Sequence, residues 1–389
     1  MKVGILTFHR AHNCGAMLQC FALQTVLERM GHAVDVLDCN GIGEEKRFRN
    51  LCLWPLRRSA RKVIEFLFSL GSFDLRLLRF AKFRRCNLHL SAPVDFRNFP
   101  QKYDRYIVGS DQVFQPNLTK ELAPLFLLDA VLDNTKKFSY AASFGYESLP
   151  EKFRPLYKRC LDKFAGLSVR EASGAKIIQE ELELKKNVSV VLDPTLLLTA
   201  ADYAPIERRI ASPEKYVLVY SIGGAYKKLR DTAKQVAEKF GLKIVYVNAC
   251  RRHYWDVPFS DYLSVSPDRL IYLIHHAQFV VTTSFHGVAF SLIYHKPFIA
   301  ILPNDSKVAG RIPALLSKVG LLNNVILETE VISDRLLESA KAMDYAIEKI
   351  SNVWNGELFY IIDDFLEKYF SSKRKEDGDL SYYLLRLLK

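Results

Sequence analysis

The sequence lacks several patterns that would define a class of protein. Its seven cysteines form no C-x-x-C pair, so neither a disulfide framework nor a zinc ribbon is indicated, and reduced thiols are expected. No apolar run approaches the roughly 20 residues that a membrane-spanning helix needs, and residues 1–7 begin a strand pattern in place of a secretory signal. These absences favour a cytoplasmic protein.

Two further absences limit the expected ligands. Neither a G-x-G-x-x-G fingerprint nor a Walker A lysine is present, so no nucleotide cofactor is specified. No zinc-finger, RNA-recognition or helix-turn-helix signature occurs, so nucleic acid is not an expected partner. The 389 residues, 49% hydrophobic and 25% charged, nevertheless contain enough apolar material for two hydrophobic cores.

The positive charge is concentrated in one segment. The formal net charge is +12, and residues 46–85 hold twelve basic residues against two acids, Glu65 and Asp74. Leucine, phenylalanine and isoleucine alternate with these cations at helical spacing, which predicts an amphipathic helical insertion at about residues 46–90. Such a helix pair either lies on an anionic membrane or polyanion, or packs on its domain as an ordinary hairpin with a solvated basic rim.

Short apolar runs alternate with helical spacing along most of the chain. They predict an α/β protein with two parallel sheets in tandem: an N-terminal domain of residues 1–195, a C-terminal domain of residues 196–330, and helices in residues 331–389 that pack back on the N-terminal domain. The predicted strands are 2–7, 33–37, 105–109, 137–142, 166–170, 188–192, 216–221, 243–248, 279–282 and 298–302. The predicted helices between them include 17–30, 151–164, 172–182, 227–240, 267–276, 288–294 and 309–319.

Ligands of open α/β sheets collect beyond the carboxyl ends of the strands, and the first such loop spans residues 9–15. Asn13 is predicted to cap the following helix, and Gly15 to permit close approach of another group. His9, His12 and Cys14 suggest a metal or a Cys/His nucleophile. No other cluster completes a ligand set, so no metal site is predicted.

The later loops of the N-terminal half supply charged groups. Asp111, after the third strand, either orients a sugar hydroxyl or acts as a base, or else only caps a turn together with Ser110. Arg170 ends an apolar strand, where a guanidinium is suited to grip a carboxylate or phosphate. Glu171 is in position to hold this arginine by an ion pair.

The second half repeats the pattern of strand, loop and helix. His286 is predicted at the start of a helix, beside Ser284 and Gly287. A histidine there can act as a general acid or as a phosphate ligand, although a lone histidine is more often structural. Lys307 and Arg311, after the following strand, are candidates for a second anion clamp.

Taken together, these motifs resemble the polysaccharide pyruvyl transferase family. The resemblance covers most of the chain. It rests on Gly4-Ile5-Leu6, Asn13-Cys14-Gly15-Ala16-Met17-Leu18-Gln19, Gly109-Ser110-Asp111-Gln112, Ser168-Val169-Arg170-Glu171, Leu192-Asp193-Pro194 and Ser284-Phe285-His286-Gly287, in this order. Many members carry an arginine two residues before the histidine, where this chain has Ser284.

The resemblance implies a fold and a reaction. The fold would be two Rossmann-like domains in a GT-B-like arrangement. The reaction would transfer the enolpyruvyl group of phosphoenolpyruvate onto two hydroxyls of a sugar in a polysaccharide precursor, for example of a capsule or exopolysaccharide. The products would be a cyclic ketal and phosphate. No further cofactor is implied, and the acceptor would be lipid-linked at the inner membrane face, which would give the basic insertion a peripheral membrane role.

The resemblance also implies roles for the motif residues. His286 and Asp111 would be catalytic. The donor would be bound by Arg170, His286, Lys307, Arg311 and Ser284, and the acceptor by Asn13, Gly15, Ser110, Asp111 and Gln112. The alternative function is a nucleotide-sugar glycosyltransferase on the same two-domain plan. A third hypothesis is a membrane-associated scaffold without catalysis.

Overall fold

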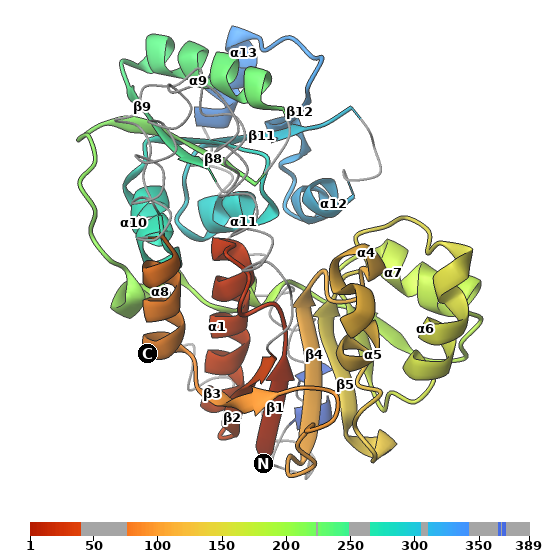
Figure 1. Cartoon of the computed structure of the whole chain (residues 1–389). Coiled ribbons are helices and arrows are strands. Elements are labelled where there is room, and N and C mark those ends of the chain that lie inside the picture. The colour runs from red at the N-terminus through yellow and green to blue at the C-terminus, as the bar shows by residue number, and fades with distance from the viewer. Residues whose placement is uncertain are drawn as a thin grey trace, which may run out of the picture.

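The chain forms two α/β units, each built around a parallel sheet (Figure 1). The computed structural model describes residues 1–39, 76–222, 225–248, 265–304, 310–341, 365–366 and 368–370. The prediction of an α/β chain with two parallel sheets is confirmed. The basic insertion lies largely outside the described residues, which include only its last helical part, residues 76–87.

The first sheet has seven strands, and β1 lies inside it. The strand order is β3-β2-β1-β4-β5-β6-β7, and Gly4 of β1 faces Asp35 on one side and Tyr106 on the other. All six residues of β5 are buried, as expected for a parallel strand covered on both faces. The strands are β1 (Lys2–Leu6), β2 (Ala33–Cys39), β3 (Leu90–Val94), β4 (Arg105–Asp111), β5 (Lys137–Ala142), β6 (Leu167–Val169) and β7 (Val188–Val190).

The second sheet has five strands in the order β12-β11-β10-β8-β9. In each sheet the first strands of the chain are added toward one edge, and the later strands are added on the other side of the first strand, toward the opposite edge. The order therefore reverses between β1 and β4 and again between β8 and β10, and such reversals open a crevice at the carboxyl ends of the strands. The strands are β8 (Tyr216–Ser221), β9 (Lys243–Asn248), β10 (Phe279–Thr282), β11 (Phe298–Leu302) and β12 (Val325–Leu327).

Helices cover both sheets. The α-helices are α1 (Cys14–Arg29), α4 (Pro116–Thr119), α5 (Ala123–Phe126), α6 (Arg154–Leu161), α7 (Ala172–Lys176), α8 (Ala200–Tyr203), α9 (Tyr226–Phe240), α10 (Pro267–His276), α11 (Phe285–Ile293), α12 (Arg311–Lys318) and α13 (Asp334–Lys341). Short helical turns are η2 (Lys120–Leu122), η3 (Asn134–Lys136), η4 (Glu151–Phe153), η5 (Ile177–Glu181), η6 (Pro194–Leu197), η7 (Ala204–Ile206) and η11 (Leu322–Asn324). Of the helices that the structure describes, none combines the length and apolar character needed to cross a bilayer.

Helix α1 joins the two units. Its buried Met17 and Leu18 belong to the same hydrophobic cluster as Ile274 of α10 and Val288 of α11. Phe80, from the end of the basic insertion, packs into this cluster as well. The junction is therefore apolar along α1, and this contact fixes the carboxyl ends of the two sheets toward each other.

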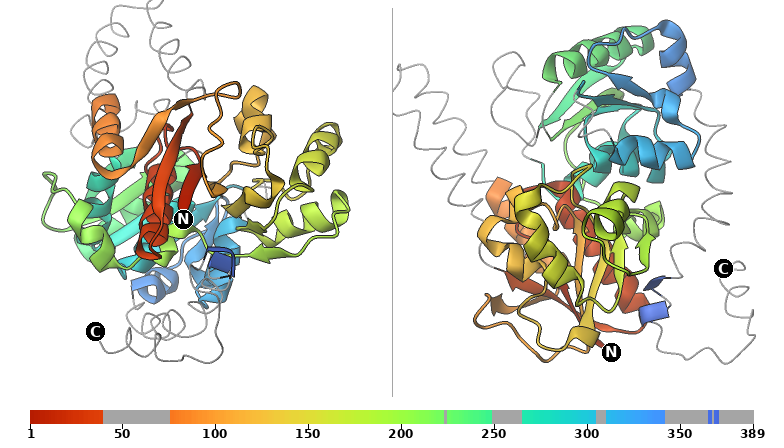
Figure 2. Two further views of the ribbon diagram at one scale, coloured as in Figure 1. Left: turned by 90° about the horizontal axis from the view of Figure 1, so that it is seen from below. Right: turned by 90° about the vertical axis from the view of Figure 1, so that its right-hand side faces the viewer.

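Residues near the end of the chain return to the first sheet. Phe365, Leu366 and Phe370 are buried against Val3 and Phe138, and this blue segment lies near the N-terminus in the side view (Figure 2). The carbonyl oxygen of Phe370 also lies 2.6 Å from His32 Nε2. The last described helical segment thus completes the core of the N-terminal unit.

The structure differs from the predicted elements at the sheet edges and in two helices. Strands β3 and β12 were not predicted, because β3 is half exposed and contains Pro93, and β12 has only three residues. The helix predicted at 151–164 is a 3₁₀ turn followed by α6, which ends at Leu161. The helix predicted at 172–182 is α7 followed by a π-helical turn.

Candidate functional site

Two helix N-termini meet between the units. Asn13 caps α1, and its Oδ1 accepts hydrogen bonds from the backbone N–H of Gly15 at 2.9 Å and of Ala16 at 3.4 Å. Ser284 caps α11, and its Oγ accepts from the backbone N–H of Gly287 at 3.3 Å. Because a helix N-terminus carries partial positive charge, two of them at one place favour an anion.

Gly15 allows His286 to lie directly against α1. A Cβ atom on residue 15 would lie only 2.1 Å from His286 Nδ1 and 2.3 Å from Cγ. The imidazole, 4% exposed as a side chain, therefore occupies the space that any larger residue at position 15 would need. The predicted close approach at Gly15 is confirmed, and the approaching group is the histidine of the other unit.

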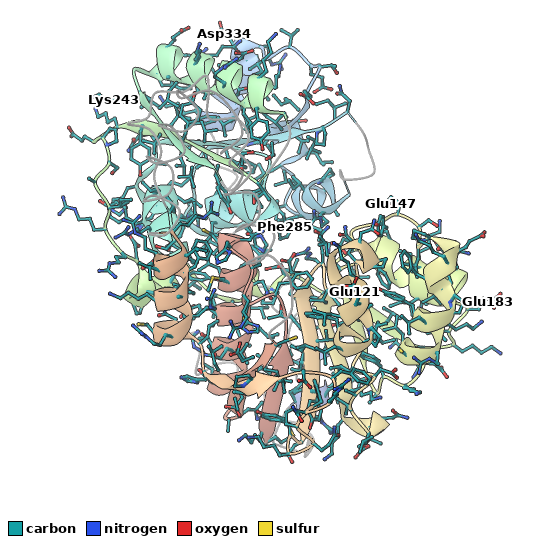
Figure 3. All side chains as sticks on the ribbon, in the orientation of Figure 1. Glu121, Glu147, Glu183, Lys243, Phe285 and Asp334 are labelled. Carbon is teal, nitrogen blue, oxygen red and sulfur yellow. The ribbon has the colours of Figure 1, made fainter. Side chains whose placement is uncertain are left out.

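Arg170 lies at the centre of the charged residues. Its Nη1 donates to Asp193 Oδ2 at 2.7 Å and its Nε to Glu171 Oε1 at 3.2 Å, while Nη2 lies 3.7 Å from Asp111 Oδ1. The ring of Phe285, from the second unit, lies 4.8 Å from Arg170 Cζ, and Figure 3 shows this ring at the junction. The guanidinium thus makes hydrogen bonds to carboxylates through two of its nitrogens, while Nη2 has only the longer ion-pair contact with Asp111.

Asp193 organises the cluster, and the sequence did not single it out as a site residue. Its Oδ1 accepts from the backbone N–H and the hydroxyl of Thr195, at 3.0 and 2.7 Å. Its Oδ2 faces Arg170, the Ser110 hydroxyl at 3.0 Å and His286 Nε2 at 3.8 Å. A sequence signal for Asp193 was present, because an acid three residues after β7 lies at the same sheet edge as Arg170, which directly follows β6.

The cluster shifts the pKa values of its members in opposite directions. Burial raises the pKa of Asp193, but His286, Arg170 and Thr195 outweigh this effect and hold it well below its usual range. Burial lowers the pKa of Arg170, but the carboxylates of Glu171, Asp193 and Asp111 outweigh that and raise it. Both groups are therefore fully ionised at neutral pH.

Two nitrogens of the cluster remain without a hydrogen-bond partner among the described residues. They are Arg170 Nη2 and His286 Nε2, and both are inaccessible to solvent. A buried donor left unsatisfied costs about 1–3 kcal/mol. One nitrogen comes from each unit, so a polar or anionic ligand that satisfied both would bridge the two units.

A depression adjoins the cluster between the loop after β5, the start of α7 and the start of α12. Gly145, Glu171 and Arg311 contribute to its lining, together with Tyr146, Glu147, Ser173 and Gly310. Burial, and then the neighbouring Arg170, lower the pKa of Arg311, so this predicted donor residue lies near the cluster. Lys307, also predicted to bind the donor, lies outside the described residues.

The remaining predicted residues divide into two groups. Ser110 is fully buried, and its Oγ lies 3.0 Å from both Asp193 Oδ2 and the Ala141 carbonyl oxygen. Asp111 and Gln112 lie nearer the depression: Asp111 faces Arg170, and Gln112 lies close to Gly145. Ser110 thus contacts Asp193 in the interior of the cluster, whereas Gln112 lies beside Gly145 of the depression and Asp111 lies beside Arg170.

His9, His12 and Cys14 point in different directions. His9 Nε2 lies 3.0 Å from Asp38 Oδ1, a carboxylate that Arg10 also binds. Cys14 Sγ lies 3.8 Å from the carbonyl oxygen of Val265, and burial raises its thiol pKa to about 12. A thiol that stays protonated is a poor nucleophile, and these three residues form no metal-ligand group among the described residues.

His12 should make stability depend on pH. Burial, and then Arg84 and Arg76, lower its pKa from 6.5 to about 4. The unfolded chain therefore binds a proton between these values that the folded chain does not, and stability falls as pH decreases from 6.5 to 4. For a shift of this size the loss is about 3 kcal/mol.

Urea unfolding of wild type and His12→Gln at pH 7 and pH 4 measures this contribution. We expect the wild type to lose more stability than the variant over this range, by about 3 kcal/mol. Equal losses in the two proteins would contradict the assignment to His12.

The structure defines a two-domain α/β protein whose charged residues gather where the carboxyl ends of its two sheets face each other. The model of the polysaccharide pyruvyl transferase family matches residues 13–306, so the chain belongs to this family and is a transferase. No curated protein is similar enough to match.

Solved structures of similar fold include two glycosyltransferases and an epimerase. The glycotransferase of kitacinnamycin is 13% identical, covers 95% of this chain and 98% of its own, and has a TM-score of 0.45. CalG4, the calicheamicin glycosyltransferase, is 12% identical with coverages of 96% and 99% and a TM-score of 0.46. UDP-GlcNAc 2-epimerase from Methanocaldococcus jannaschii is 13% identical with coverages of 87% and 91% and a TM-score of 0.45.

Proposed function

We propose that this transferase moves the enolpyruvyl group of phosphoenolpyruvate onto two hydroxyls of one sugar in a polysaccharide precursor. The observation that carries the proposal is a pair of buried nitrogens, Arg170 Nη2 and His286 Nε2, that make no hydrogen bond within the described part of the chain. They come from different units and lie where two helix N-termini meet. Phosphoenolpyruvate carries a carboxylate and a phosphate, which are the groups that such nitrogens and helix N-termini bind.

The carboxylates around Arg170 limit how much positive charge it can offer to the donor. Asp111, Glu171 and Asp193 already outnumber the one positive charge of Arg170. The additional positive charge for a donor anion must therefore come from Arg311, the two helix N-termini and, in this proposal, Lys307. Ser284 caps α11 at the same place, and its hydroxyl remains a proposed contact of the donor.

The proposed reaction has two steps, and each forms one bond between a sugar oxygen and the central carbon of the donor. In the first, a proton goes to the methylene carbon of phosphoenolpyruvate, and one sugar hydroxyl oxygen bonds to its central carbon. In the second, the other hydroxyl oxygen bonds to the same carbon while the carbon–oxygen bond to phosphate breaks, and the proton of this hydroxyl leaves with the phosphate, which gives a cyclic ketal and inorganic hydrogen phosphate. His286 is proposed as the acid of the first step, and Asp111 as the group that orients a hydroxyl and takes its proton.

The acceptor is proposed to lie toward the loops of the first unit. Gln112 lies beside Gly145, which lines the depression, and Asp111 lies beside Arg170. Asn13 and Gly15 contribute the α1 terminus, and the Ser110 hydroxyl contacts Asp193. We further propose that the acceptor is lipid-linked and that the basic segment binds an anionic membrane surface, since the charge of residues 46–85 suits such a surface. The precursor would then belong to a capsule or exopolysaccharide made at the inner membrane face.

Ligand-induced thermal stabilisation tests the donor. A ligand at 100 times its Kd adds about 2.7 kcal/mol to stability, so phosphoenolpyruvate should raise the melting temperature of the wild type. The rise in melting temperature should disappear in Arg170→Lys, which keeps the positive charge but loses the planar guanidinium with its paired N–H donors. It should also disappear in His286→Ala. Arg159→Ala, which removes an exposed arginine paired with Asp129, is the matched control and should respond as the wild type does.

A different ligand response would overturn the proposal. Stabilisation by a UDP-sugar without any effect of phosphoenolpyruvate would indicate the alternative, a nucleotide-sugar glycosyltransferase. Stabilisation by phosphoenolpyruvate that survives in both Arg170→Lys and His286→Ala would place the donor elsewhere on the protein.

A further inference from the structure

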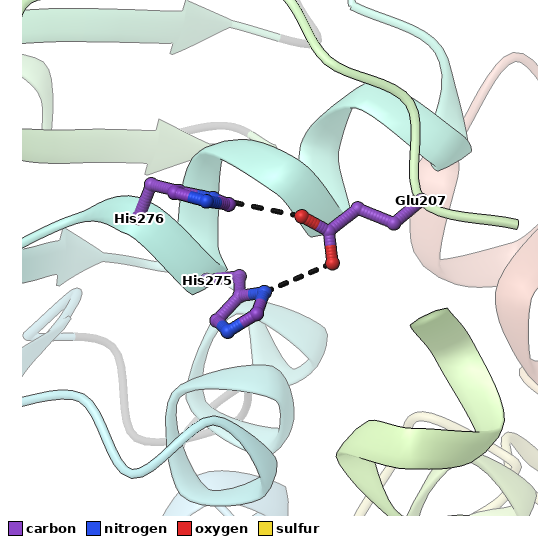
Figure 4. Close-up of side chains that lie close together, drawn as sticks. All are labelled: Glu207, His275 and His276. Carbon is purple, nitrogen blue, oxygen red and sulfur yellow. Dashed lines mark hydrogen bonds and ion pairs between the residues drawn. The ribbon is translucent and has the colours of Figure 1, made fainter. Parts of the chain in front are cut away.

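A second cluster of side chains is formed by Glu207, His275 and His276 (Figure 4). Glu207 lies in the connection between the two sheets, after η7 and before β8. His275 and His276 end α10, just before β10 begins. The cluster therefore lies at the amino ends of the strands, whereas His286 follows the carboxyl end of β10.

The ligand atoms of these three residues converge. Glu207 Oε2 lies 2.9 Å from His275 Nδ1, and Oε1 lies 3.5 Å from His276 Nδ1. One ligand atom from each residue lies within 4.8 Å of the other two. Atoms bound to one zinc ion at about 2.0–2.1 Å in tetrahedral geometry are roughly 3.3 Å apart, so small side-chain rotations bring this set to coordination distance.

Aromatic stacking holds both imidazoles in place. The ring of His275 stacks on Tyr294 with centroids 4.6 Å apart, and the ring of His276 stacks on Tyr272 at 4.1 Å. His276 Nδ1 also lies 2.9 Å from the Tyr272 carbonyl oxygen, a hydrogen bond that a metal at this nitrogen would replace. Because the rings are already ordered, a ligand that binds both loses little additional side-chain entropy.

Charge and exposure also suit a cation. The two histidines end α10, where the helix dipole places partial negative charge, and Glu207 adds a full negative charge. The carboxylate side chain is 14% exposed, whereas the histidines are 46% and 45% exposed, so one side of the cluster opens to solvent. Two imidazole nitrogens and one carboxylate suit zinc and its transition-metal neighbours, and they do not suit calcium or magnesium.

We infer that Glu207, His275 and His276 bind one divalent transition-metal ion, with zinc as the best match, and that water completes its coordination. The ion would fasten the connection between the sheets to the end of α10. It would stabilise the second unit and take no part in the chemistry at Arg170 and His286, which lies at the other edge of the sheet.

Metal titration tests the inference. Protein free of any histidine tag and stripped with a chelator is titrated with zinc chloride by calorimetry, and with cobalt(II) chloride by visible absorption. We expect one equivalent of zinc to bind, a cobalt spectrum typical of nitrogen and oxygen ligands, and a higher melting temperature with zinc. His275→Ala and Glu207→Gln should each weaken zinc binding by about tenfold or more, because a three-ligand site loses one ligand.

The chain offers a matched control. His89 Nδ1 lies 2.7 Å from Glu28 Oε1, a histidine–glutamate pair that gains no third ligand from the described residues. His89→Ala should bind zinc as the wild type does. The inference is wrong if the wild type binds no stoichiometric zinc, or if both cluster variants retain full affinity. It is equally wrong if His89→Ala loses as much affinity as they do. Melting in excess chelator shows that each variant is folded before titration, and Glu207→Gln provides the test should His275→Ala not fold.

Discussion

Asp193→Asn should destabilise the protein by about 3–5 kcal/mol, the cost of breaking a buried ion pair by removing one partner. The side chain is fully buried and accepts hydrogen bonds from Arg170 and Thr195. The variant therefore replaces the carboxylate at 2.7 Å from the guanidinium by an amide, and leaves Arg170 with the longer ion pairs to Glu171 at 3.2 Å and Asp111 at 3.7 Å. The fixed position of Arg170 is lost as well, and phosphoenolpyruvate should no longer raise the melting temperature. Urea unfolding and thermal melting with the donor measure the two effects.

The matched control is Asp129→Asn. Asp129 also pairs with an arginine, since its oxygens accept from Arg159 at 2.9 and 3.1 Å, but that guanidinium is about half exposed. Exposed pairs contribute about 0–1 kcal/mol, so this variant should stay near wild type and keep its response to the donor. Similar losses in the two variants would refute the central role of Asp193.

Gly15→Ala should disrupt the site by overpacking. The added methyl group would lie 2.1 Å from His286 Nδ1, so either the imidazole or α1 must move, at a cost of about 3 kcal/mol. Because the ring is displaced, stabilisation by phosphoenolpyruvate should be lost even in the molecules that remain folded. Denaturant unfolding and the donor-induced thermal shift are measured on the same preparation.

The double variant Gly15→Ala/His286→Ala separates crowding from other effects at position 15. It removes the ring atoms at 2.1 and 2.3 Å and leaves only the Cβ contact at 2.8 Å. Stability should therefore recover in part, while the donor response stays absent. A double variant that is less stable than the sum of the two single changes would contradict the packing of Gly15 on His286.

Much of the fold could be predicted, because the inner strands are apolar runs between breakers. Strands such as β5 and β8 are buried along their whole length, and apart from Lys137, Ser139 and Ser221 their residues are apolar or aromatic. Edge strands lack this signal: β3 contains Pro93 and exposes half of its side chains, so its pairing with β2 depends on tertiary contacts that no local pattern encodes.

The sequence predicted individual residues of the site, but not the contacts between them. The rule that ligands collect at carboxyl ends of strands selected Asp111, Arg170 and His286, and the structure brings these three residues together. The role of Asp193 depends on the register of β6 beside β7, and in sequence it resembled an ordinary cap before Pro194. The contact of Gly15 with His286 joins two units, and a local pattern carries no information on such a contact.

The return of Phe365, Leu366 and Phe370 to the first sheet affects how the protein is made. These side chains are buried against Val3 and Phe138 near the start of the chain. On the ribosome, which releases the chain from its N-terminus, the first unit must wait for residues 365–370 before this face of its core is covered. Its last folding step therefore follows the synthesis of the second unit, and a nascent chain that stalled early would expose an apolar surface to chaperones.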